Sequence, residues 1–192
     1  MEKQGEIVFA PYDRVLKHLL PIVPHKLKPN HLTMVRLVLA PLLIIPLHYD
    51  DYIVALVAFV LLAITDMLDG SLARLRNQIT DWGKIWDPVA DKLLVGVVVV
   101  MMLLKVNLSL TILVLSLEAA FILGGVLQKM HEENVDIKAN VWGKIKMNLQ
   151  CFGAGLLMLG FILVEPTLFT LGEVAFYFSL FFAVLSIFKH GI

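Results

Sequence analysis

Long apolar stretches separated by short polar segments dominate the chain after residue 30. Hydropathy predicts six membrane-spanning helices, near residues 31–48, 52–75, 83–104, 108–129, 141–164 and 170–189. Residues 8–23 instead mix apolar and charged side chains at helical spacing, which predicts a short amphipathic helix in the membrane interface. The pattern therefore predicts an all-α integral membrane protein, with six transmembrane helices preceded by an N-terminal interfacial helix, in a single domain over residues 1–192.

Several residues mark or bend the predicted helices. Asn30 or Thr33 can cap the start of the first span. Pro41 and Pro46 should bend that span, because proline interrupts the helical hydrogen bonds. Pro88, one turn into the third span, should free a backbone carbonyl for another partner.

The composition supports a membrane protein and excludes some partners. Of the 192 residues 59% are hydrophobic, which leaves room for one membrane domain and no second domain. The 16 basic and 16 acidic residues cancel, so we expect no nucleic-acid partner. Cys151 is the single cysteine, so no intrachain disulfide is expected, and the N-terminal segment lacks the apolar core of a cleavable signal peptide.

Lysine and arginine are distributed unevenly between the two ends of the predicted spans. The loops at 49–51 and 165–169 contain none, and the turn at 105–107 contains only Lys105. Because basic residues concentrate on the cytoplasmic side of membrane proteins, both termini and the 74–84 turn should face the cytoplasm. We therefore expect a multi-pass protein of the cytoplasmic membrane.

Four aspartates are the principal candidates for chemistry. Asp66 and Asp69 are three residues apart, and Asp87 and Asp91 are four apart, so each pair lies on one face of a helix. The apolar runs beside the pairs have 12 residues each, whereas a span needs about 20, so the acids should lie below the membrane surface. Four carboxylates at that depth need cations, and hard oxygen ligands without His or Cys favour Mg²⁺ or Mn²⁺. Two such ions would suit phosphoryl chemistry, and an active site there would open to the cytoplasm.

The aspartates belong to a longer motif, D-x2-D-G-x2-A-R-x8-G-x3-D-x3-D, whose eight fixed positions span 26 residues. These positions are Asp66, Asp69, Gly70, Ala73, Arg74, Gly83, Asp87 and Asp91. The motif resembles the signature of the CDP-alcohol phosphotransferase family. The resemblance implies transfer of a phosphatidyl group from CDP-diacylglycerol to an alcohol, with release of CMP, by a homodimer within membrane lipids.

The resemblance also implies roles for individual residues. Asp66, Asp69 and Asp87 would ligate two Mg²⁺ or Mn²⁺ ions, and Asp91 would deprotonate the acceptor hydroxyl while lying close to a metal. The residues implied for the CDP-lipid pocket are Asp69, Gly70, Ala73, Arg74 and Gly83. Small residues at such positions let a bulky group approach the helix backbone, although close helix packing would also favour them.

The acceptor is indicated by two further elements. Asn30 to Arg36 reads N-x-L-T-x-x-R and residues 143–146 read G-K-I-K, and both resemble the phosphatidylglycerophosphate synthase branch of the family. A phosphorylated acceptor such as glycerol 3-phosphate needs cations. The acceptor-binding candidates are Arg36, Lys92, Glu118, Lys144 and Lys146. Each cation could instead be an anchor at the lipid headgroups, and inositol phosphate, phosphatidylglycerol, serine or an amino alcohol remain alternative acceptors.

One position departs from that branch. Where the branch usually has an Arg-Glu pair in the fourth helix, this chain has Leu117-Glu118. Glu118 lies near mid-span and needs a partner. It either contributes to a polar site or forms a structural bond with Arg36 or Lys92.

Two other classes of function are possible. A divalent-cation carrier could use the four acids as a transport site, but this would leave Gly70, Ala73 and Arg74 unexplained. A purely structural membrane protein would leave the acids themselves without a purpose. The acidic segment after His131 is expected to be a solvated loop, and Gly153, Gly155 and Gly160 are candidates for helix packing within or between subunits.

Overall fold

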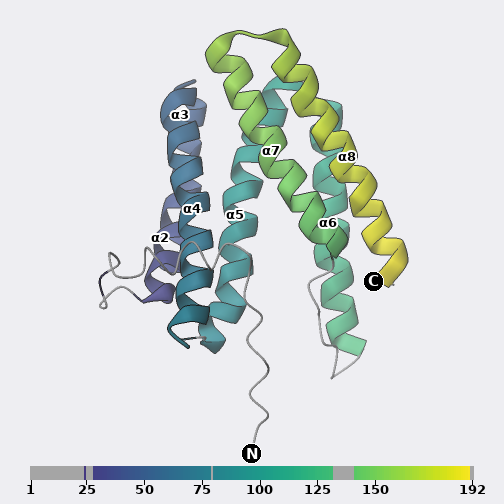
Figure 1. The fold of residues 1–192 in the computed structure, drawn as a ribbon. Coiled ribbons are helices and arrows are strands. Elements are labelled where there is room, and N and C mark those ends of the chain that lie inside the picture. The colour runs from purple at the N-terminus through teal and green to yellow at the C-terminus, as the bar shows by residue number, and fades with distance from the viewer. Residues whose placement is uncertain (1–23, 25–27, 79, 132–140, 191–192) are drawn as a thin grey trace, which may run out of the picture. The chain divides into compact units, whose positions relative to one another are not determined.

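The computed structural model describes Pro24 and residues 28–78, 80–131 and 141–190, and every regular element in these ranges is an α-helix (Figure 1). The helices are α2 (Pro29–Leu42), α3 (Ile44–His48), α4 (Tyr52–Leu75), α5 (Asp81–Val106), α6 (Leu108–His131), α7 (Val141–Leu163) and α8 (Pro166–His190). The all-α class is thereby confirmed. The predicted interfacial helix at 8–23 and the loop at 132–140 lie outside the described residues.

Four stretches of the described residues are long and apolar enough to cross a membrane, as expected of an integral membrane protein. They are Pro29–His48, Tyr52–Leu75, Val141–Leu163 and Pro166–Ser186. Helices also form over the third and fourth predicted spans, but α5 carries charged residues from Asp81 to Lys105, and the apolar part of α6 is the shorter Leu108–Gly124. Six spans therefore remain a prediction.

Local sequence explains where the helices begin and end. The first span is divided at Leu43, since Pro46 has no N–H to donate to the carbonyl of Leu42. α4 begins after Asp51, whose Oδ1 accepts a hydrogen bond from Val54 N at 3.2 Å. After α4 the chain turns at Asn77, which has φ 52°, a left-handed conformation that asparagine tolerates.

The described residues form two compact units, and α4 and α5 each pass from one into the other. The first unit contains α2, the part of α4 from Val57 onward and the part of α5 up to Leu94. The second contains Ile44–Leu56 and the described residues from Val95 onward. In the second unit α7 and α8 lie side by side in opposite directions, joined by a short turn (Figure 1).

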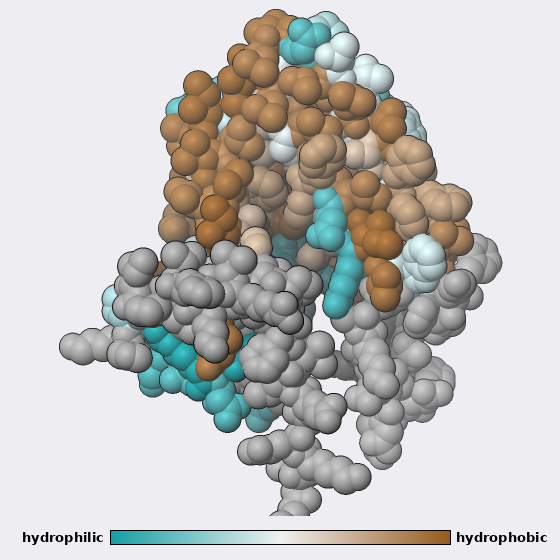
Figure 2. All heavy atoms as spheres, in the orientation of Figure 1, coloured by the Kyte–Doolittle hydropathy of each residue, from teal (hydrophilic) through white to brown (hydrophobic). Residues whose placement is uncertain are grey.

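The described surface is largely hydrophobic in the view of Figure 2. Exposed apolar side chains follow α4 and α8 in particular, namely Val57, Val60, Leu61, Ile64, Val174, Phe178 and Phe181. Water-soluble monomers rarely expose so continuous an apolar surface, whereas lipid chains solvate it well. The surface thus agrees with the apolar composition of the spans.

Candidate active site

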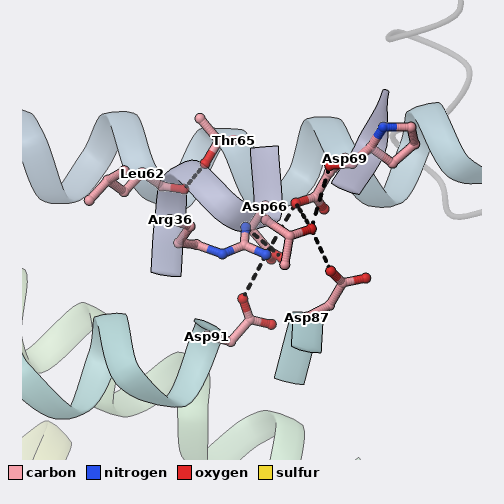
Figure 3. Close-up of polar contacts among 9 residues, drawn as sticks. Arg36, Leu62, Thr65, Asp66, Asp69, Asp87 and Asp91 are labelled. Carbon is pink, nitrogen blue, oxygen red and sulfur yellow. Dashed lines mark hydrogen bonds and ion pairs between the residues drawn. The ribbon is translucent and has the colours of Figure 1, made fainter. Parts of the chain in front are cut away.

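Three helices of the first unit bring six polar residues together, and Figure 3 labels all of them except Thr33. The residues are Thr33 and Arg36 from α2, Asp66 and Asp69 from α4, and Asp87 and Asp91 from α5. Within each helix the spacing of three or four residues places the two side chains on one face. The four aspartates, which the sequence predicted to lie crowded together at the same end of two helices, are therefore close together in the fold.

Arg36 lies at the centre of this group (Figure 3). Its Nη1 is 3.0 Å from Asp66 Oδ1, and its Nη2 is 3.1 Å from Asp69 Oδ2 and 3.2 Å from Asp91 Oδ1. The Arg36 side chain is 0% exposed, so the aspartates are its partners in place of water. One buried cation thus pairs with three of the four acids of the motif.

The pairing of Arg36 is electrostatic rather than directional. Its three guanidinium nitrogens make no hydrogen bond with any residue that the structure describes, although three carboxylates lie within ion-pair distance. The carboxylate oxygens are close enough for charge attraction but lack the angles that a hydrogen bond requires. Arginine commonly forms two parallel hydrogen bonds with one carboxylate, and here it shares its charge among three instead.

Thr33 and Asn30 connect α2 to α5. Thr33, which is 1% exposed, donates a hydrogen bond from Oγ1 to Asp87 Oδ1 at 2.6 Å. Asn30 Oδ1 accepts a hydrogen bond at 2.9 Å from the hydroxyl of Thr80, which directly precedes α5. Thr80 Oγ1 in turn accepts a hydrogen bond at 3.0 Å from the backbone N–H of Gly83, in the first turn of α5.

The sequence interpretation of Asn30 and Thr33 as helix caps is wrong, because α2 begins at Pro29 with Lys28 in the capping position. Asn30, Thr33 and Arg36 are each three residues apart and share one helix face. That regular spacing is the signal that could have assigned all three to the site.

The residues expected in the nucleotide pocket lie beside these acids along α4 and α5. A Cβ atom added at Gly83 would lie 3.3 Å from Asp87 Oδ2 and 3.5 Å from Asn30 Oδ1. One added at Gly70 would lie 3.3 Å from Arg74 Nη1, which belongs to the same helix. A methyl group at either glycine would crowd these side chains, so the glycines let polar side chains of the chain itself lie close to the helix backbone, and Ala73 keeps the same stretch of α4 small.

The remaining acceptor candidates are divided between the two units. Lys92 is exposed on α5 in the first unit, and Lys144 is exposed on α7 in the second. Lys146 Nζ lies 2.6 Å from Glu118 Oε1 and 4.6 Å from the centre of the Phe121 ring. The positive charge of Lys146 is thus compensated.

The expected bond of Glu118 with Arg36 or Lys92 is not the one found. Glu118 Oε1 accepts hydrogen bonds from Lys146 Nζ at 2.6 Å and from Gln150 Nε2 at 3.0 Å. Sequence distance does not show which helix faces α6, and the alternative of a polar-site role for Glu118 stays a prediction. The donors come from α7, where Lys146 and Gln150 are four residues apart on one face.

A third cation, Lys105, pairs with an acid in the turn between α3 and α4. Lys105 Nζ donates a hydrogen bond to the carbonyl of Leu47 at 2.7 Å and forms an ion pair with Asp50. The Lys105 hydrogen bond, together with that from Tyr52, holds the pKa of Asp50 below its usual value of 3.8. The only basic residue expected in the 105–107 turn is therefore charge-compensated.

A test of the predicted metal centre rests on the donor set. Among the described residues no three or more His, Cys, Asp and Glu side chains are arranged as metal ligands, and Asp66, Asp69 and Asp91 pair with Arg36 instead. The donors themselves fit Mg²⁺ or Mn²⁺, because four carboxylates and the Thr33 hydroxyl supply hard oxygen atoms from adjoining helix faces.

Comparison with known proteins identifies the family. The model of the CDP-alcohol phosphatidyltransferase family matches residues 26–185, so the chain belongs to this family, as the motif indicated. It is therefore an enzyme, a transferase of phospholipid biosynthesis.

Several relatives carry the name CDP-diacylglycerol–glycerol-3-phosphate 3-phosphatidyltransferase. The protein from Rickettsia felis is 35% identical over 135 residues, which cover 69% of this chain and 75% of the relative. The protein from Bacillus subtilis is 29% identical over 176 residues, which cover 82% of this chain and 90% of the relative. A shorter match, to the protein from Aquifex aeolicus, is 47% identical over 64 residues, or 33% and 36% of the two chains.

Proposed function

We propose that this enzyme transfers the phosphatidyl group of CDP-diacylglycerol to glycerol 3-phosphate and releases CMP. The observation that carries the proposal is the convergence of the four motif aspartates from α4 and α5 on one place in the first unit. The names of the relatives support the choice of donor and acceptor.

The reaction assigns separate tasks to the acids. Asp66, Asp69 and Asp87 would hold two divalent ions, with Asp91 close by, and the bound ions would neutralise the pyrophosphate charge. The acceptor hydroxyl oxygen forms a bond to the lipid-bearing phosphorus while its proton passes to the Asp91 carboxylate. The bond between that phosphorus and the CMP oxygen breaks, and CMP leaves. Asp91 is 21% exposed, which leaves it accessible to an acceptor.

The small residues and Arg74 are proposed to receive the cytidine diphosphate. Gly70, Ala73 and Gly83 carry little or no side chain, and Asp69, which directly precedes Gly70, would belong to both this pocket and the metal site. Arg74 supplies a cation for a phosphate oxygen. For the phosphate of the acceptor we propose Lys92, which is exposed on α5 and follows Asp91 directly in the chain. Lys144 and Lys146 remain candidates from the sequence alone.

The orientation follows from the distribution of basic residues. We propose that both termini and the aspartate cluster face the cytoplasm, in a multi-pass protein of the cytoplasmic membrane. Asp50 also neutralises Lys105, so the end of the spans away from the cytoplasm carries even less positive charge. A homodimer, as expected from the family, remains a prediction.

An assay of CMP release tests the proposal. Purified protein with CDP-diacylglycerol and Mg²⁺ should release CMP when glycerol 3-phosphate is added. With inositol phosphate, serine or phosphatidylglycerol as the single acceptor, the enzyme should release far less CMP. Release with another acceptor instead would correct the acceptor, and release with none would overturn the proposed reaction.

The assigned base is tested by Asp91→Asn. An amide cannot accept the hydroxyl proton, so the rate of CMP release should fall by about 100-fold or more. The matched control is Asp51→Asn, the same chemical change outside the proposed site, where asparagine caps a helix as well as aspartate does. Full activity of Asp91→Asn would remove Asp91 from its role.

A further inference from the structure

We propose that Arg36 is a resident counter-cation of the aspartate cluster, which holds Asp66, Asp69 and Asp91 together and competes with divalent cations for them. The inference rests on the proposed function, because it takes these acids as the metal site. It assigns Arg36 to positioning and not to the acceptor, as the sequence had suggested.

The geometry supports the holding role. A single guanidinium lies 3.0, 3.1 and 3.2 Å from carboxylate oxygens of two different helices, α4 and α5. Carboxylates that surround a single guanidinium lie near one another, and they repel one another strongly when little water surrounds them. Arg36 is fully buried and Asp69 is 3% exposed, so water screens this pair little, while Asp66 and Asp91 are 41% and 21% exposed. Arg36 therefore offsets the repulsion between the acid-bearing faces of the two helices.

The same geometry shows why a metal ion could displace the guanidinium. The Arg36 nitrogens make no hydrogen bond among the described residues, so charge attraction alone binds them to the acids. A divalent ion offers twice the charge and accepts carboxylate oxygens from any direction that its coordination allows. The carboxylates can turn to such an ion without the loss of a directional bond to Arg36.

The sign of the competition follows from the charges. The four aspartates carry a formal charge of −4, which Arg36 reduces to −3. Removing the guanidinium charge restores −4 and removes a repulsion between two cations at short distance. A cation that competes should therefore weaken metal binding, whereas a residue needed only to shape the site should strengthen it. Substitution of Arg36 separates these two roles by the sign of the change.

Direct measurement of Mn²⁺ binding by electron paramagnetic resonance, without substrate, tests the inference. The purified wild type, Arg36→Gln and Arg36→Lys are compared at equal concentration in detergent. We expect Arg36→Gln to bind Mn²⁺ about tenfold tighter than the wild type or more, because the competing charge is gone. Arg36→Lys keeps the charge but its single ammonium reaches fewer carboxylates, so its affinity for Mn²⁺ should lie between those of the wild type and Arg36→Gln. The matched control, Arg76→Gln, alters an arginine that donates to the carbonyl of Pro24 and should bind as the wild type does.

The outcomes distinguish the inference from the proposed function. If the wild type binds Mn²⁺ and Arg36→Gln binds it equally or more weakly, the inference is overturned while the metal site stands. If the wild type binds no Mn²⁺, the metal site of the proposed function fails, and the inference fails with it.

A thermal measurement decides the case in which Arg36→Gln does not fold. The single ammonium of Arg36→Lys cannot reach three carboxylates as a guanidinium does, so without metal this variant should melt below the wild type. Mn²⁺ should then raise its melting temperature more than that of the wild type. An equal or smaller rise would contradict a counter-cation role.

Discussion

Thr33 shows how one small side chain on α2 fixes an acid of the motif on another helix. Its hydroxyl lies 2.6 Å from Asp87 Oδ1 and 3.5 Å from Asp69 Oδ2. A hydrogen bond to an ionised group stabilises more than one between neutral groups, and it also fixes direction. Thr33 therefore supplies the directional contact that Arg36 does not make.

Replacing Thr33 by valine should show this effect. Thr33→Val keeps the shape but removes the donor, which should destabilise the protein by about 1–3 kcal/mol and lower the rate of CMP release. Thr33→Ser retains the hydroxyl and is the matched control for the lost hydrogen bond. Thermal unfolding and the CMP assay measure the two effects, and wild-type behaviour of Thr33→Val in both would contradict the assigned contact.

At the scale of helices, α7 and α8 pack closely through glycine. A Cβ added at Gly153 would lie 2.9 Å from the ring of Phe176, which is fully buried, and 3.2 Å from the carbonyl oxygen of Gly172. Gly160 faces the Phe169 ring in the same way, whereas nothing lies within 4 Å of a Cβ at Gly155. Two of the three glycines singled out from the sequence thus serve packing inside the subunit.

The substitution Gly153→Ala should therefore disturb the pair of helices. The added methyl group meets a buried ring and a backbone carbonyl, so we expect a loss of about 1–3 kcal/mol of stability. Gly155→Ala is the control on the same helix, and it should be neutral or stabilise by up to about 1 kcal/mol through helix propensity. Thermal unfolding in detergent measures both, and equal effects would contradict the described packing of α7 on α8.

For the whole molecule, the proposed orientation places the two ends of α4 on opposite sides of the membrane. Tyr49, before α4, is 77% exposed, and Gln78, after α4, is also exposed. Both lie outside the proposed active site. They are therefore suitable positions at which to measure orientation.

Single cysteines at these positions test the orientation. In a Cys151→Ser background, Tyr49→Cys should react with a membrane-impermeant maleimide added to intact cells, and Gln78→Cys should react only after the cells are permeabilised. The Cys151→Ser protein without an added cysteine is the control for background labelling. The reverse pattern would place the aspartate cluster on the outer side.

The sequence alone was sufficient for features that depend on neighbouring residues. The long apolar stretches predicted the helices, and the break near Pro46 follows from the missing N–H of proline. The spacing of the aspartates predicted their shared helix faces and carried the resemblance that the family match confirmed. These features can be predicted from the sequence because helical periodicity and motif spacing are properties of a continuous segment of chain.

Only the tertiary structure decided which side chains meet across helices. Arg36 and Lys146 looked alike in the sequence, as cations for an acceptor, yet one is buried among three aspartates and the other is paired with Glu118. A charged group within a membrane protein takes whichever partner the packing of the helices brings near, because water is not there to replace it. That choice depends on contacts between residues 28 to 55 positions apart, such as Glu118 with Lys146 and Arg36 with Asp91, and no local pattern encodes it.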